Sequence, residues 1–337
     1  MSRSALALLV LISGVGRPVP GLVMALRTGL PPAAHATTAP SGPLGTAGGS
    51  QKVEAQCGVV MMASGQGYAA TAMRVANRTS RLSARKGWCP LDSELDHVPV
   101  TLFTDIDPLT LQRYVDFEVA KVGKAVGTSN LRIRPIRELP PWEGPMSNKR
   151  LKGHLGNWML RWYHAQIILA APYTMVTYLD VDALPCTAHG ITRLMEKLIS
   201  QHAFFGAPMV IDFLKCQSSA GDCAVPHPGG INAQELRDWT SFTERNSGVM
   251  VMDMRQARPI AKDFASAIVR HAGNVSGDQF ALREALFIHR HDVPQLTFND
   301  SEVCRYRRPS EIRCETEAKT GCAIHHLPQM GSLQIMR

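Results

Sequence analysis

Short apolar runs alternate with longer amphipathic stretches between about residues 56 and 328. Apolar runs bounded by small or polar residues predict buried strands at residues 57–63, 98–103, 131–136, 175–179, 203–209 and 249–252. Apolar positions at helical spacing predict helices at residues 68–82, 149–169, 255–271 and 278–286. Strands that alternate with helices predict an α/β fold, in which helices flank both faces of one mostly parallel sheet.

The rest of the chain has a different character. Residues 217–240 are rich in Gly, Pro and polar side chains, which predicts a surface excursion, and the sequence from Asp300 onward is polar and rich in Cys. We therefore expect a leader and low-complexity linker over residues 1–55, one domain over residues 56–328, and a tail over residues 329–337.

The leader contains no acidic side chain before Glu54. Its short apolar run at residues 5–12, together with Ala34-His35-Ala36, resembles a signal peptide with a small-residue cleavage site. Two other interpretations stay open. Residues 6–26 form a poor single-pass anchor that would attach the protein to a membrane, and an acid-free leader with Arg and Ser is also typical of an organelle transit peptide.

Eight cysteines and three N-glycosylation sequons, at Asn77, Asn274 and Asn299, also bear on location. Disulfides would close small loops between Cys216 and Cys223, and within the trio Cys304, Cys314 and Cys322. Together with the leader, these features favour an oxidising secretory compartment, and we expect the Golgi lumen. The alternative is a plastid or cytosolic protein with reduced, buried cysteines.

Charge and hydropathy exclude some classes of function. The net charge is +8, from 36 Lys+Arg against 28 Asp+Glu, but the basic residues are scattered and no nucleic-acid-binding motif is present, so we expect no nucleic-acid partner. No run of 18 or more apolar residues crosses residues 56–328, which excludes a protein with several membrane spans.

The strongest candidate chemistry lies in Asp180-Val181-Asp182, directly after the predicted strand at residues 175–179. Ligands bind beyond the carboxyl ends of the strands in sheets of this kind. Two carboxylates there suit Mg²⁺ or Mn²⁺, which take oxygen ligands and keep positions free for phosphate. A bare Asp-x-Asp is common, and ordinary solvated carboxylates are the alternative interpretation.

Four blocks in order resemble glycosyltransferase family 8, whose members are nucleotide-sugar transferases of the GT-A fold. The blocks are Asp180-Val181-Asp182, Asn246-Ser247-Gly248 with the apolar residues after it, Gly277-Asp278-Gln279-Phe280, and a late His. The resemblance implies a GT-A sheet, a nucleotide-diphosphate sugar as donor, Mn²⁺ or Mg²⁺ as cofactor, a glycan, protein or lipid acceptor, and retention at the transferred sugar. The family's His-x-x-Gly is replaced here by His325-His326-Leu327-Pro328, which leaves the third metal ligand open.

The resemblance also implies roles for individual residues. The metal would be bound by Asp180, Asp182 and either His325 or His326, and the nucleoside by Ala63, Ser64 and Asp105. Asn246 and Ser247 would lie near the donor sugar and the acceptor. Asp278 and Gln279 would lie beneath the transferred sugar. Asp278 would stabilise an oxocarbenium-like transition state. Arg161 stands near the family's basic residue before Asp-x-Asp. The structural alternatives are a turn at Asn246, a helix start at Asp278 and an exposed helix charge at Arg161.

The sequence also bears on three other classes of protein. A nucleotidyltransferase needs a basic phosphate loop after the first strand, but only Arg74 lies within ten residues after Ser64. A metal-dependent hydrolase would be expected to carry regularly spaced His pairs, and His289-Arg290-His291 stands alone. A non-catalytic binding module of the same fold remains an alternative. The sequence favours a metal-dependent glycosyltransferase.

Overall fold

The computed structural model describes residues 55–64, 66–82, 84–107, 109–111, 113, 130–142, 155–209, 232–271, 278–305 and 322–326. The chain divides into the units Met1–Gly49 and Ser50–Arg337, and every described residue belongs to the second. The expected leader and tail lie outside the described residues. Within those residues, no helix is both long enough and apolar enough to cross a membrane.

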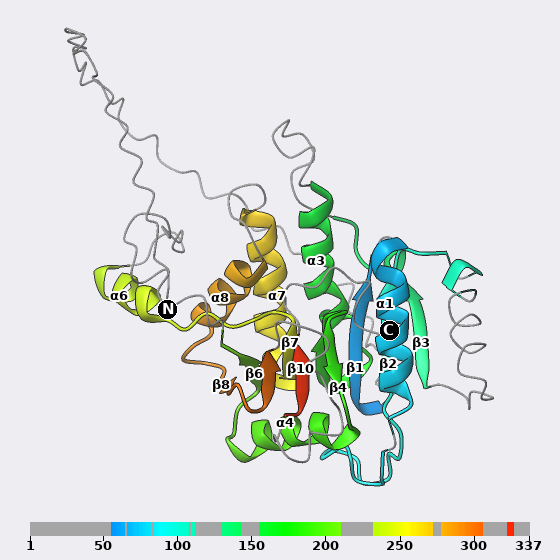
Figure 1. The fold of residues 1–337 in the computed structure, drawn as a ribbon. Coiled ribbons are helices and arrows are strands. Elements are labelled where there is room, and N and C mark those ends of the chain that lie inside the picture. Colours follow the sequence, from blue (N-terminus) through cyan, green and yellow to red (C-terminus); the bar gives the residue numbers. More distant parts are fainter. Residues whose placement is uncertain are drawn as a thin grey trace, which may run out of the picture. The chain divides into compact units, whose positions relative to one another are not determined.

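A seven-stranded sheet with the order β3-β2-β1-β4-β7-β6-β8 forms the centre of the second unit (Figure 1). Its strands are β1 (Ala55–Ala63), β2 (Val100–Thr104), β3 (Leu131–Pro135), β4 (Tyr173–Leu179), β6 (Phe205–Pro208), β7 (Val249–Asp253) and β8 (Gln295–Phe298). β7 pairs antiparallel with β4 and β6, and the other pairs in this sheet are parallel. The predicted mostly parallel sheet is confirmed, with one reversed strand.

Helices flank this sheet, as the pattern predicts. They are α1 (Gln66–Ser80), α3 (Leu155–Leu169), α4 (Ala188–Ser200), α6 (Ala233–Ser241), α7 (Met254–His271) and α8 (Asp278–Ile288), with a short 3₁₀ helix at Ile136–Glu138. In β1, Val60 and Met62 join a buried cluster with residues of α3, α7 and α8, whereas Val59 and Met61 join one with residues of α1 and α4. Both faces of β1 are therefore buried, which explains its unbroken apolar run.

Two segments differ from the sequence-based expectation. The end of the expected surface excursion at residues 217–240 is instead α6, which begins with a capping box between Asn232 and Glu235. Helix α4, which was not predicted, buries Ile191, Leu194 and Leu198 at helical spacing. The helix expected from residue 149 is described from Leu155, and residues 149–154 lie outside the described residues.

A second, three-stranded sheet has the order β5-β10-β9. Its strands are β5 (Ala183–Pro185), β9 (Val303–Arg305) and β10 (Ile324–His326), and β10 lies antiparallel to β5 and parallel to β9. A disulfide between Cys304 and Cys322, called here the carboxy-terminal disulfide, joins β9 to the residues before β10. The small sheet thus brings a late segment of the chain against the segment that follows β4.

Other cysteines are also paired. Cys57 of β1 and Cys89 form a second bridge, called here the amino-terminal disulfide, and Cys186 is disulfide-bonded as well. Disulfides are therefore present, as the cysteine pattern predicts. Cys216, Cys223 and Cys314 lie outside the described residues.

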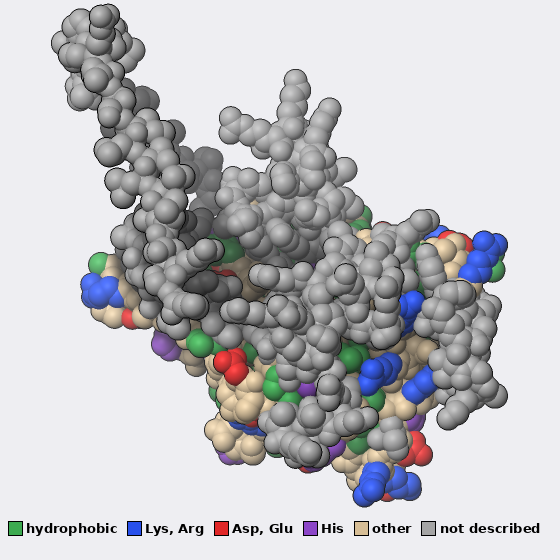
Figure 2. All heavy atoms as spheres, viewed as in Figure 1, with side chains coloured by type: hydrophobic (Ala, Val, Ile, Leu, Met, Phe, Trp, Pro, Cys, Tyr) green, Lys and Arg blue, Asp and Glu red, His purple; other side chains and the backbone are tan. Residues whose placement is uncertain are grey.

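The scattered charge of the sequence is also visible on the surface. On the face drawn in Figure 2, the Lys and Arg side chains of the described residues stand in separate places rather than in one continuous patch.

Candidate functional site

The direction of β7 brings two distant segments together at the carboxyl end of β4. Leu179, the last residue of β4, is paired with Val249, the first residue of β7. The residues that leave β4 therefore lie beside those that enter β7. The backbone N–H of Asp180 donates to the carbonyl oxygen of Gly248 at 2.8 Å. Two motifs far apart in the sequence meet at this edge of the sheet.

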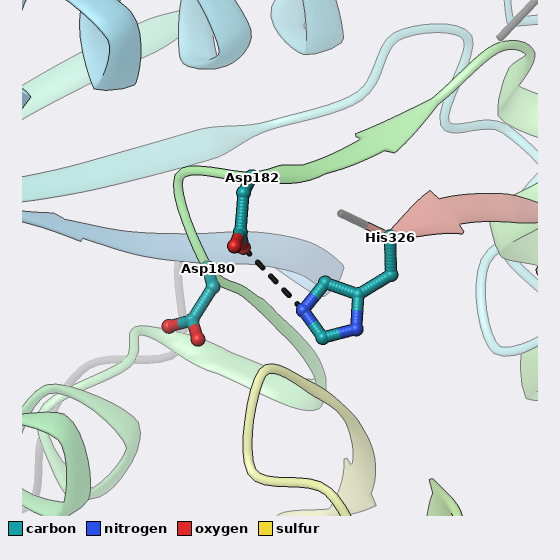
Figure 3. Close-up of side chains that lie close together, drawn as sticks. All are labelled: Asp180, Asp182 and His326. Atoms are coloured by element: carbon teal, nitrogen blue, oxygen red, sulfur yellow. Dashed lines mark ion pairs between the residues drawn. The ribbon is translucent and has the colours of Figure 1, made fainter. Parts of the chain in front are cut away.

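The small sheet adds a third segment. β5 begins directly after Asp182, and its first residue, Ala183, is paired with His326 of β10. This register places the imidazole Nε2 of His326 3.4 Å from Oδ1 of Asp182 (Figure 3). One ligand atom each from Asp180, Asp182 and His326 lie within 4.8 Å of one another. These three residues, called here the Asp-Asp-His group, come from two distant parts of the chain, the segment after β4 and strand β10.

His325, the other candidate third ligand, lies outside the Asp-Asp-His group. Successive residues of a strand point to opposite faces, so His325 and His326 cannot both face Asp182. The Nδ1 atom of His325 instead lies 3.7 Å from the sulfur of Cys322. Burial and, secondarily, the charge of Arg78 lower the pKa of His325. The structure therefore places His326, and not His325, with the two aspartates.

The chemistry of the Asp-Asp-His group fits a divalent cation. The contact between His326 and Asp182 is longer than an ordinary hydrogen bond. Oδ1 of Asp182 is buried and has no hydrogen-bond partner among the described residues. A buried carboxylate oxygen without a partner is costly unless a cation joins it. Two carboxylates and one imidazole are ligands that a divalent cation accepts.

Gly248 leaves a space beside the Asp-Asp-His group. A Cβ atom at this position would lie 2.8 Å from Oδ2 of Asp180, 2.9 Å from Nε2 of His326 and 3.0 Å from Oδ1 of Asn246. Glycine, which has no Cβ atom, avoids these three close contacts. The Asn246 side chain holds the turn, because its Oδ1 accepts from the N–H of Gly248 at 2.8 Å. Sequence reasoning named Asn246 and Ser247, both of which are buried, but it missed the role of Gly248.

Sequence reasoning also missed Tyr178 and Arg245. The Tyr178 hydroxyl donates to Oδ1 of Asp180 at 2.5 Å. The sequence spacing of Tyr178 and Asp180 could have indicated this contact, because residues i and i+2 of a strand share a face. Arg245, next to Asn246, donates to Gln295 at 2.7 Å and to Thr297 at 3.2 Å, which ties the turn to β8. Burial lowers the pKa of Arg245 to about 10.

The candidate nucleoside contacts lie at the same edge of the sheet. Ala63 ends β1 opposite Thr104, the last residue of β2, and β1 is parallel to both β2 and β4. The hydroxyl of Ser64 donates to Oδ2 of Asp105 at 2.7 Å. Ala63 therefore ends one strand near β4, and Ser64 and Asp105 directly follow two such strands.

Three candidate residues, Asp278, Arg161 and Gln279, have no described contact with the Asp-Asp-His group. Asp278 opens α8 and Arg161 lies within α3, but both side chains lie outside the described residues. Gln279 is partly buried, and its Oε1 has no hydrogen-bond partner within the described part of the chain. No described contact joins Gln279 to the Asp-Asp-His group. The catalytic roles of these three residues stay predictions.

Comparisons with known proteins give structural likeness only. No protein-family model matches the sequence, and no curated protein matches it. Mouse xyloside xylosyltransferase 1 in its apo form has a TM-score of 0.45 and 13% identity, over 81% of this chain and 98% of that chain. The galactosyltransferase LgtC, in complex with donor and acceptor sugar analogues, has a TM-score of 0.45 and 16% identity, over 80% and 87% of the two chains. The bifunctional glycosyltransferase WbbM in its apo form has a TM-score of 0.48 and 14% identity, over 82% of this chain and 46% of that chain. Likeness at these values assigns no function to this chain.

Proposed function

We propose that this protein is a metal-dependent glycosyltransferase, which moves a sugar from a nucleotide-diphosphate donor to a glycan, protein or lipid acceptor. One observation carries the proposal. Asp180 and Asp182, which follow β4, and His326, from β10, converge at the carboxyl edge of a mostly parallel sheet. Ligands of α/β sheets bind at this edge, and the sequence blocks found there resemble those of nucleotide-sugar transferases.

The Asp-Asp-His group would hold Mn²⁺, or Mg²⁺ as the second choice. When bound, the cation supplies charge neutralisation to the departing nucleoside diphosphate. The chain's own residues have separate tasks. Gly248 keeps the space beside the ligands open, and Asn246 holds that turn in place. Asp105, steadied by Ser64, offers a carboxylate to a ribose hydroxyl or a base N–H.

The sugar-handling residues follow from the sequence blocks rather than from contacts. Asp278 and Gln279, at the start of α8, would face the transferred sugar, with Ser247 near the donor or acceptor and Arg161 as a cationic group. Asp278 would stabilise positive charge that develops at the anomeric carbon. The sugar, hexose or pentose, depends on the shape of this part of the site. Retention at the anomeric carbon is part of the proposal.

For location, we propose the lumen of the secretory pathway, with the Golgi as the first choice and a plastid as the alternative. Two disulfides among the described residues support an oxidising compartment, because disulfides are rare in reducing ones.

The experiment that tests the function measures release of nucleoside diphosphate from a panel of nucleotide sugars. The full chain is assayed with Mn²⁺, with chelator, and as Asp182→Ala. Asp292→Ala, which removes an exposed carboxylate after α8, is the matched control. We expect release from one donor that requires Mn²⁺, disappears in Asp182→Ala and persists in Asp292→Ala.

Two outcomes would count against the proposal. Release that survives both the chelator and Asp182→Ala would remove the metal-dependent mechanism. No release from any donor, by protein shown to be folded by circular dichroism, would favour a binding module without catalysis.

A further inference from the structure

We propose that Tyr178 is a positioning residue for the metal, acting through Asp180. The inference rests on the proposed metal-dependent function, because it assigns a role towards the same Asp-Asp-His group. It goes beyond that function by naming the side chain that determines which oxygen of Asp180 faces the group.

The two oxygens of the Asp180 carboxylate have different surroundings. Oδ1 accepts the short hydrogen bond from the Tyr178 hydroxyl, at 2.5 Å. Oδ2 lies on the Gly248 and His326 side, since a Cβ on Gly248 would lie 2.8 Å from this atom and 2.9 Å from Nε2 of His326. A carboxylate held at one oxygen has lost most of its freedom to rotate about χ2. The bond from Tyr178 therefore presents Oδ2 to the group.

Tyr178 is itself held firmly. Its side chain is 1% exposed and belongs to the buried cluster on the α3 and α7 face of the sheet. On the sheet it is flanked by Val60 of β1 and Met250 of β7. Its ring also contacts the ring of His164, with centroids 5.5 Å apart. A phenol fixed in this way delivers its hydroxyl to one place, as partners behind metal ligands must.

The hydrogen bond has two opposite effects on metal affinity. Their balance decides whether Tyr178→Phe raises or lowers the dissociation constant for Mn²⁺. Donation to Oδ1 withdraws some negative charge from the carboxylate, which weakens its attraction for a cation. The same bond fixes the ligand in place before the metal arrives. Loss of partners behind metal ligands typically costs 10–100-fold in affinity, so we expect positioning to outweigh charge withdrawal.

Strand β4 supplies a matched control in Tyr173, at its other end. Tyr173 is also buried, at 5% exposure, and its hydroxyl shares a 2.8 Å hydrogen bond with Thr101 of β2. Tyr173→Phe and Tyr178→Phe each remove one buried hydroxyl from the same strand and leave the ring. Only Tyr178→Phe removes a contact to Asp180.

The experiment titrates Mn²⁺ alone into the full chain and measures the dissociation constant by electron paramagnetic resonance of free Mn²⁺. Four proteins are compared: wild type, Asp182→Ala, Tyr178→Phe and Tyr173→Phe. Thermal unfolding without metal is recorded for each. We expect Tyr178→Phe to raise the dissociation constant by about 10–100-fold and Tyr173→Phe to leave it within about twofold of wild type.

The outcomes separate this inference from the proposed function. Wild type that binds Mn²⁺ no better than Asp182→Ala overturns the metal site, and this inference falls with it. Wild type that binds, with Tyr178→Phe binding equally or more tightly, overturns only the role of Tyr178. An equal loss of affinity in both Phe variants would show a general effect of strand stability, and would also overturn that role.

Discussion

Replacing Gly248 with Ala tests the candidate site most directly. The new methyl carbon would lie 2.8 Å from Oδ2 of Asp180, 2.9 Å from Nε2 of His326 and 3.0 Å from Oδ1 of Asn246. Ordinary van der Waals contact with a Cβ begins at 3.4 Å. Each of the three atoms must therefore withdraw by about 0.4–0.6 Å, or the turn must move by a similar amount.

This displacement exceeds what a metal site tolerates. Ligand distances in a functional site lie within about 0.2 Å of their ideal values. Because two of the crowded atoms are proposed ligands, we expect Mn²⁺ affinity to fall by at least about 100-fold, the upper end for losses caused by residues behind the ligands. Overpacking costs about 1–3 kcal/mol of folding stability, which corresponds to a Tm lower by roughly 2–10 °C in a domain of this size.

The assay is Mn²⁺ binding to the full chain, paired with thermal unfolding, and Gly206→Ala is the control. A Cβ at Gly206 would lie 2.5 Å from the Phe298 ring and 2.6 Å from Leu198, so it crowds the apolar core rather than the site. Both variants should lose stability, but only Gly248→Ala should lose metal affinity. Unchanged Mn²⁺ affinity in folded Gly248→Ala would refute the position of the metal beside this turn.

Four further outcomes are expected. Replacing both cysteines of the carboxy-terminal disulfide with Ser should cost about 3 kcal/mol of stability and weaken Mn²⁺ binding, because the bridge precedes the strand that carries His326. The same replacement in the amino-terminal disulfide should lower Tm without changing Mn²⁺ affinity. Peptide mapping after secretion from a eukaryotic host should find a glycan on Asn299, which is exposed in a turn. It should find none on Asn77, because Thr79 of the same sequon is buried within α1. A glycan on Asn77 and none on Asn299 would contradict this exposure. Burial raises the pKa of Glu244, despite the opposing charge of Arg283, so its stability contribution is present below pH 4.5 and is lost as pH rises through the raised pKa. Unfolding of wild type and Glu244→Gln across pH 4–8 should show wild type losing stability relative to the variant; a constant difference would exclude this titration.

The strands were predictable where burial alone determines the pattern. β1 is apolar on both faces because helices cover both, and its run of Cys57 to Ala63 carries no other signal. Asp180 and Asp182 were predictable as a site for the same reason, since they end such a run. Helix α4 was detectable from the spacing of its buried residues and from its N-cap, Thr187, which accepts from Gly190.

The assembly of the site was not predictable from local pattern. The apolar run of β7 is the same whichever way the strand points, yet its reversal puts Gly248 beside Asp180. The choice between His325 and His326 depends on the register of β10 against Ala183. A strand of three residues is too short to show a period of two, so this register is a tertiary property.

The ribosome completes the small sheet after the large one. Synthesis proceeds from the amino terminus, and every strand of the large sheet is complete once Phe298 has emerged. Asp180 and Asp182 are made long before that point, but His326 is made after it. A chain released just after β8 would contain all seven strands of the sheet and lack one of the three proposed ligands. Tight Mn²⁺ uptake would then distinguish molecules that contain β10 from molecules that terminate before it.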